Sequence, residues 1–209
     1  MSSGRLDVAD GVPGRSAQLH VTDDPSGLRG KPVTRWQGSL LLCCLAMCST
    51  EAATPPAASE YQVKAAFLFQ FSRFVEWPRE AFANSDAPLL ICVLGTNPFG
   101  PALAEMAEGE LAYTHPLQVQ SHDRVEDLDA CHIVFVSSDK ENVSRRVVQY
   151  LSGKSVLTVS DSSDFARHGG VIGLVTVNGK VRVQVNRNSA DAAQLKISAK
   201  LLRVADLTG

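Results

Sequence analysis

The chain has 209 residues, 44% of them hydrophobic, and a formal net charge of -2 at pH 7. This length is enough for one ordinary domain with a terminal segment, and the apolar fraction is sufficient for a core. The balanced charge, without an evident basic stripe, argues against a nucleic-acid-binding protein. No apolar run is long enough to predict a membrane span in the mature protein.

The N-terminal segment is predicted to lie outside the folded domain. Residues 1–32 are polar and rich in Gly, Ser and Asp, which predicts a disordered extension or a misplaced start, with Val33 as the true first residue. Residues 33–53 combine a basic residue, a short apolar run and then small residues, the pattern of a secretory signal peptide. Residues 54–59 predict a linker to a folded domain over residues 60–207. We therefore expect an exported protein.

The cysteines fall into two groups. Cys43, Cys44 and Cys48 lie within the predicted signal peptide, whereas Cys92 and Cys131 belong to the folded part. Two cysteines in an exported domain suggest a disulfide, because the compartments outside the cytosol are oxidising. The alternative is a pair of buried free thiols.

The longest helical pattern begins at Glu60, and Pro78 is expected to stop it. Ser59 is the predicted N-cap, in a capping box. Phe69 projects on the polar side of this helix, near Arg73. In one interpretation a neighbouring segment covers part of Phe69; in the other, Phe69 and Arg73 contact a partner protein. The polar side is expected to include Gln62, Lys64, Ser72, Arg73 and Glu76, and the apolar side consists of Val63, Ala66, Phe67, Leu68, Phe71, Phe74 and Val75.

Strands and helices alternate through the middle of the chain. This alternation predicts an α/β fold in three layers, with a mostly parallel sheet and helices on both of its faces. Asn97 is the predicted N-cap of the first connecting helix, and Gly153 ends the second. Strands are predicted at residues 89–94, 114–121, 132–136 and 155–159, and helices at 99–107, 143–151 and 162–167.

The C-terminal part predicts an antiparallel hairpin. Asn178-Gly179 separates two apolar-rich runs, residues 171–177 and 180–186, which is a strong hairpin signal. In the second run valines alternate with Arg182, Gln184 and an asparagine, so we expect an edge strand with one solvated face. Arg182 and Gln184 are therefore further candidates for contact with a partner. Residues 188–205 predict either one helix or two, with Ser198 capping the second.

The sequence carries little chemistry. It contains no nucleophile elbow, P-loop or zinc-protease motif, and its histidines lack metal-ligand spacing. We predict no catalytic residue, metal or cofactor. Asp139, Asp161 and Asp164, with Asn97, are expected near the carboxyl edge of the sheet, where open α/β sheets bind ligands. Capping of a short helix by Asp161 and Asp164 is the favoured alternative.

The folded part opens with the aromatic segment YQVKAAFLFQFSRFVEWP, residues 61–78. Shorter segments follow in order, at residues 90–95, 133–136, 156–161, 169–172, 183–186 and 195–202. Together these segments resemble the YfiR family of periplasmic regulators. Each is weak alone, and it is their order that makes the resemblance specific.

The resemblance implies a periplasmic, non-enzymatic repressor that tends to dimerise. Proteins of this family bind the periplasmic sensor domain of an inner-membrane, YfiN-like diguanylate cyclase and inhibit it. Release of the cyclase raises the level of cyclic di-GMP and favours biofilm formation. Cys92 and Cys131 match one family disulfide, whereas the second, C-terminal pair of cysteines is absent from this chain. The resemblance also implies sensitivity to redox conditions through disulfides, and the absence of the second pair puts redox control of the release of the cyclase in doubt for this chain.

Two other classes of function stay open. One is a small-ligand-binding sensory module that serves a membrane receptor kinase through loops 95–100, 137–142 and 160–164. The other is an enzyme that uses the acidic loops. A preformed pocket favours the first, and metal-dependent stabilisation that Asp161→Asn abolishes favours the second.

Overall fold

The computed structural model describes residues 57–137 and 141–209, which belong to one compact unit, Glu51–Gly209. The predicted extension (1–32) and signal peptide (33–53) lie outside the described residues. The predicted linker (54–59) lies partly outside them as well, and its last residues are helical, because the first helix begins at Ala57.

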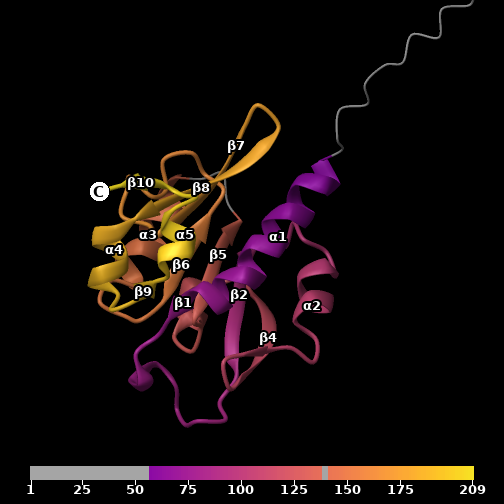
Figure 1. The fold of residues 1–209 in the computed structure, drawn as a ribbon, viewed down its shortest axis with the longest axis vertical. Helices are drawn as coiled ribbons and strands as arrows, with labels where there is room; N and C mark the ends of the chain where they lie inside the picture. Colours follow the sequence, from indigo (N-terminus) through magenta and orange to yellow (C-terminus); the bar gives the residue numbers. More distant parts are fainter. Residues whose placement is uncertain (1–56, 138–140) are drawn as a thin grey trace, which may run out of the picture. The chain divides into compact units, whose positions relative to one another are not determined.

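The fold is built on an eight-stranded sheet of order β10-β8-β7-β6-β5-β2-β4-β3 (Figure 1). The neighbours from β7 to β4 pair in parallel, whereas β7–β8 and β3–β4 are antiparallel. The expected α/β class and mostly parallel sheet are confirmed. The strands are β2 (Leu89–Gly95), β3 (Leu111–Ala112), β4 (His115–His122), β5 (Ile133–Ser137), β6 (Leu157–Ser160), β7 (Ile172–Val177), β8 (Lys180–Asn186) and β10 (Asp206–Thr208).

Apolar side chains form one core on each face of the sheet. Along β2, Ile91 and Val93 belong to the core under the long first helix, while Cys92 and Leu94 belong to the core under α3. Figure 1 shows α1 lying across one face of the sheet. The helices are α1 (Ala57–Phe74), α2 (Ala102–Ala107), α3 (Glu141–Tyr150), α4 (Arg187–Ala192) and α5 (Ala199–Leu202), with short 3₁₀ turns η1 (Arg79–Ala81) and η2 (Val125–Leu128).

Helix α1 differs from its prediction at both ends. It begins before Ser59, so Ser59 does not cap it. It ends at Phe74, ahead of Pro78, because the next two residues form strand β1 (Val75–Glu76), which pairs with β9 (Lys196–Ile197). Long-range pairing therefore stops the helix before the proline does.

The buried face of α1 also differs in part from the predicted one. Val63, expected in the core, is 46% exposed, whereas Lys64 and Ser72, expected on the polar side, are buried. Both polar groups have partners: Lys64 forms ion pairs, and the Ser72 hydroxyl donates to the Phe69 carbonyl (2.6 Å). Because both groups have partners, the helix can turn this side inward without leaving a polar group unpaired.

Two local predictions are wrong because turns form where helices were expected. Asn97 accepts a hydrogen bond from the Phe99 amide (2.9 Å) within its own loop, and α2 begins only at Ala102. Residues 162–167, predicted to be helical, form a series of turns. Asp161 and Asp164 therefore cap no helix there.

The C-terminal hairpin is confirmed, but β8 is not an edge strand. Asn178 and Gly179 have φ angles of 51° and 72°, which matches the left-handed turn that joins twisted strands. Strand β10 pairs with β8 and covers the edge that the sequence predicted to be free. Two helices follow, and Ser198 caps the second, as one of the two alternatives proposed.

Candidate functional site

The carboxyl edge of the sheet, where ligand binding was predicted, is organised around Asp161. This residue directly follows β6. Its carboxylate accepts hydrogen bonds from the Tyr61 hydroxyl (3.0 Å) and from Lys64 Nζ (3.1 Å), both on the first turns of α1. Both donors reach the same oxygen, Oδ2, and we call this arrangement a clamp because it holds the start of α1 to the residue after β6.

Lys64 is the centre of this clamp. Its side chain is 4% exposed, and Nζ also lies 2.6 Å from Glu60 Oε1. Glu60 in turn accepts a hydrogen bond from the Thr176 hydroxyl (2.6 Å) on β7. The hydrogen bonds from Lys64 and then Thr176 lower the pKa of Glu60 below its ordinary value. The clamp therefore ties α1 to both β6 and β7.

The other predicted crevice residues do not join Asp161. Asp164 is exposed and pairs with Arg167 (3.3 Å). Asn97 is used within its own loop, where it also donates to the Gly100 carbonyl (3.3 Å). Asp139 lies outside the described residues. Tyr61 and Lys64 are polar groups on the first helix that need partners, but sequence reasoning could not identify Asp161, because it is 97 or more residues away.

The four predicted partner-contact residues lie on opposite faces of the sheet. Phe69 packs partly against the core under α1, and Arg73 stacks on its ring (4.8 Å) and pairs with Glu110 (2.7 Å). Arg182 is exposed and Gln184 is half-buried on β8. Because the valines that alternate with them face the α1 core, Arg182 and Gln184 face the other way. One flat interface cannot include both pairs.

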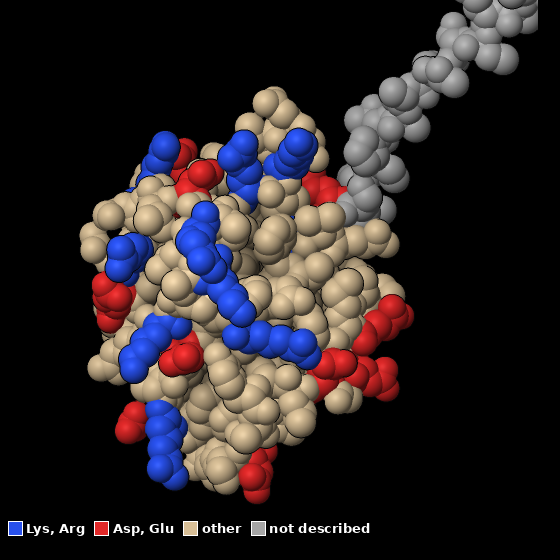
Figure 2. Space-filling view, viewed as in Figure 1, with Lys and Arg blue, Asp and Glu red and all other residues tan. Residues whose placement is uncertain are grey.

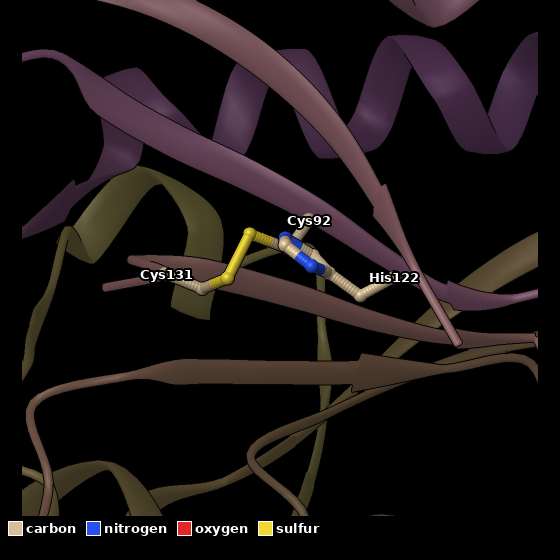
Figure 3. Close-up of side chains that lie close together, drawn as sticks. All are labelled: Cys92, His122 and Cys131. Atoms are coloured by element: carbon tan, nitrogen blue, oxygen red, sulfur yellow. A yellow bond between two sulfur atoms is a disulfide. The ribbon is translucent and has the colours of Figure 1, made fainter. Parts of the chain in front are cut away.

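The structure joins Cys92 and Cys131 in a disulfide, as the cysteine count predicts. Their Cα atoms are 6.0 Å apart, because Cys92 is on β2 and Cys131 lies two residues before the start of the neighbouring β5. His122, at the end of β4, lies beside the disulfide (Figure 3). Sequence reasoning missed this histidine, since no short spacing links it to either cysteine.

An aromatic cavity of about 650 Å³ opens near the amino ends of β2 and β4. Phe82 lines this cavity, and the Phe82 ring stacks on the rings of His115 (centroids 3.7 Å apart) and His132 (4.4 Å). Sequence reasoning did not find this cavity, because its walls come from segments that only the strand order brings together. Its lining includes Glu76, Trp77, Arg79, Phe82, Tyr113 and His115.

His132 is buried beside this cavity, and both of its ring nitrogens have hydrogen-bond partners. Its Nδ1 accepts from the Leu90 amide (3.1 Å), which leaves the proton on Nε2 to be donated to the Ala81 carbonyl (3.1 Å). Burial lowers the pKa of His132 from 6.5 to about 4, although the bond to Ala81 acts in the opposite direction. A second proton, on Nδ1, would point at the Leu90 N–H group and remove this hydrogen bond.

We predict that His132 makes folding stability depend on pH. Since its pKa is lower in the folded chain, the unfolded chain binds more protons between about pH 4 and 6.5. The contribution of neutral His132 to folding stability is complete above pH 6.5 and is lost as the pH falls toward 4. Because of this residue, the free energy of unfolding measured with urea should be about 1 to 2 kcal/mol lower at pH 5 than at pH 7. His132→Gln should remove that difference, and the exposed His168→Gln should not; equal pH dependence in parent and His132→Gln contradicts the assignment.

Together the fold and the site define a small, disulfide-bonded α/β domain whose acidic residue at the carboxyl sheet edge is held by its own first helix. Within the described residues no helix is long and apolar enough to cross a membrane. The chain belongs to the YfiR/HmsC-like family, whose sequence model matches residues 61–206. This confirms the resemblance seen in the sequence. A search among curated proteins finds no match to the chain.

Proposed function

We propose that the protein is a periplasmic, non-enzymatic regulator that binds the periplasmic sensor domain of an inner-membrane diguanylate cyclase and represses cyclic di-GMP synthesis. The observation that carries this proposal is the family match over residues 61–206, nearly all of the described domain. Repression follows from a population shift: the regulator binds the inactive conformation of the sensor better than the active one, so its occupancy sets cyclase activity.

The disulfide supports the proposed location. Disulfides persist in the periplasm and are rare in the cytosol, where thiol systems reduce them. The Cys92–Cys131 bond lies in the folded domain, and its half-cystines are 0% and 4% exposed. A protein exported through the predicted signal peptide would form this bond in its own compartment.

A basic surface near the end of α1 is our candidate for docking. Residues 187–203, which follow the hairpin, contain four Lys or Arg and one Asp, an imbalance that the near-neutral whole-chain charge conceals. Lys200 and Arg203 lie one turn apart on and after α5, are exposed, and have no ion pair within the described part of the chain. Helix α5 begins beside the end of α1, because Ser198 N donates to the Phe74 carbonyl (2.8 Å).

This surface fits an acidic partner. Figure 2 shows Lys and Arg side chains gathered over the face that carries α1 and α5, with acidic side chains mainly at its margin. Complementary charge guides encounter and fixes orientation at protein interfaces. We therefore propose that an acidic surface of the cyclase sensor docks here, with Arg73 and Phe69 at its border, and that the hairpin side with Arg182 and Gln184 stays outside.

The experiment is to measure binding of the purified protein to the sensor domain by calorimetry. Lys200→Glu/Arg203→Glu should weaken binding at least tenfold, since rim charge reversal replaces attraction by repulsion. Arg182→Glu is the matched control on the opposite sheet face and should leave affinity unchanged. A loss with Arg182→Glu alone would move the interface to the hairpin, and absence of binding by the parent would overturn the proposed function. Light scattering on the same samples reports whether the protein forms a homodimer.

A second candidate is the small-ligand sensory module that serves a receptor kinase. The cavity of about 650 Å³ beside Phe82 favours it, since clefts of this size that combine aromatic walls with polar groups hold small molecules. The cavity is not at the loops that the sequence predicted. A thermal shift with a panel of metabolites, abolished by Phe82→Ala and unaffected by Asp161→Asn, would favour this function over direct repression.

A further inference from the structure

The disulfide and His122 bring three potential metal ligands together. One ligand atom from each of Cys92, His122 and Cys131 lies within 4.8 Å of the other two. Figure 3 shows the imidazole of His122 beside the sulfur atoms. The sheet explains this arrangement: His122 pairs with Leu94 on the neighbouring β2, two residues after Cys92 and therefore on the same face.

His122 has an unusual environment for a histidine. Its Nε2 atom is buried and has no hydrogen-bond partner in the described part of the chain. Buried polar atoms are nearly always paired, so an unpaired ring nitrogen needs an explanation. A disulfide sulfur is a poor partner for it, whereas a metal ion bound to two thiolates would be a good one.

We propose that Cys92, Cys131 and His122 form a zinc site when the disulfide is reduced. A dithiol reductant donates two electrons and two protons to the S–S bond; the two cysteine thiols form, and the reductant becomes its cyclic disulfide. Zinc binding then displaces both thiol protons into solvent, with formation of two Zn–S bonds and one Zn–N bond. Three protein ligands leave the fourth tetrahedral position to water.

The ligand set and its surroundings favour this ion. Thiolate and imidazole ligands suit zinc, which tolerates tetrahedral sites of mixed composition. Two thiolates on one zinc ion lie about 3.7 Å apart, a separation that rotation of the two cysteine side chains can provide. The site lies against buried Leu94, Val125 and Leu128, an apolar environment in which bare thiolates are unfavourable. A divalent cation compensates their charge.

Zinc would hold the same segments together as the disulfide does. Both cross-links connect β2 to Cys131, two residues before β5, and the zinc site adds β4 through His122. The reduced chain would then keep its folded structure in zinc and lose stability in its absence. This inference concerns a state that the family assignment does not describe, and it is independent of the proposed cyclase partner.

The test uses the full chain with Cys43, Cys44 and Cys48 replaced by Ser, so that only the two cysteines of the site remain. The protein is reduced with a dithiol, freed of it by gel filtration under argon, and titrated with zinc chloride against a chromogenic chelator. We expect about one zinc ion per chain and a higher Tm of the reduced protein in zinc. His122→Gln should weaken zinc binding at least tenfold, and His168→Gln, the exposed matched control, should not.

Three results would overturn the proposal. The first is zinc affinity that is the same in His122→Gln as in the parent. The second is equal binding by the oxidised protein, in which no thiolate is available. The third is a reduced protein that binds no zinc, or that loses its near-ultraviolet circular dichroism whether or not zinc is present.

Discussion

Reduction of the Cys92–Cys131 disulfide in metal-free buffer is expected to lower the free energy of unfolding by about 4 kcal/mol. The bond closes a loop with a sequence separation of 39 residues, and in the chain-entropy description a loop of this length restricts the unfolded ensemble by that amount. It also fastens β2 to β5, the neighbouring strands at the centre of the sheet. For a domain of this size the Tm should fall by about 10 °C.

Urea unfolding of oxidised and reduced protein measures the difference directly. The variant with Ser at positions 43, 44 and 48 ensures that only this disulfide responds to the reductant. Cys92→Ala/Cys131→Ala gives the same comparison without reductant, with an added cost for the lost sulfur atoms in the core. A difference below about 1 kcal/mol between oxidised and reduced protein would mean that native packing already holds the two strands together.

The sequence predicted the parts of the fold that local patterns determine. Continuous apolar runs gave β2, β5 and β6, and Asn178-Gly179 gave the hairpin, because each pattern reflects burial or backbone geometry within a few residues. The strands β1, β9 and β10 could not be predicted in this way. They are two or three residues long, and only their pairing with distant segments defines them.

The candidate site shows the same division. Cysteine count and predicted export were enough to predict the disulfide, since only two cysteines occur in the folded part. His122 could not be placed beside the disulfide, because no spacing in the sequence predicts the strand order that puts β4 next to β2. Lys64 was placed on the solvated side of α1 because it is charged, yet its partner Asp161 lies 97 residues away. Charge predicts exposure only when no distant partner is present.

This partnership leads to the second large effect: Lys64→Ala is expected to destabilise the protein by about 3 kcal/mol. The substitution removes the buried ammonium group and leaves the carboxylate of Asp161, whose side chain is 13% exposed, without its cation. Loss of one partner of a buried pair costs more than the pair contributes, because the remaining charge stays poorly solvated. The same change also opens space at the start of α1.

The matched control is Arg73→Ala at the other end of the same helix. Arg73 and Glu110 form an ion pair with side chains 42% and 47% exposed, so its loss should cost less than about 1 kcal/mol.

Lys64→Met/Asp161→Asn removes both charges while it keeps the aliphatic volume, and it should recover much of the stability lost in Lys64→Ala. Urea unfolding at pH 7 provides all three values. Equal losses for Lys64→Ala and Arg73→Ala would contradict the assignment, because the clamp would then be no stronger than a surface ion pair. A loss of the expected size would assign to Asp161 the structural role of holding α1 on the sheet.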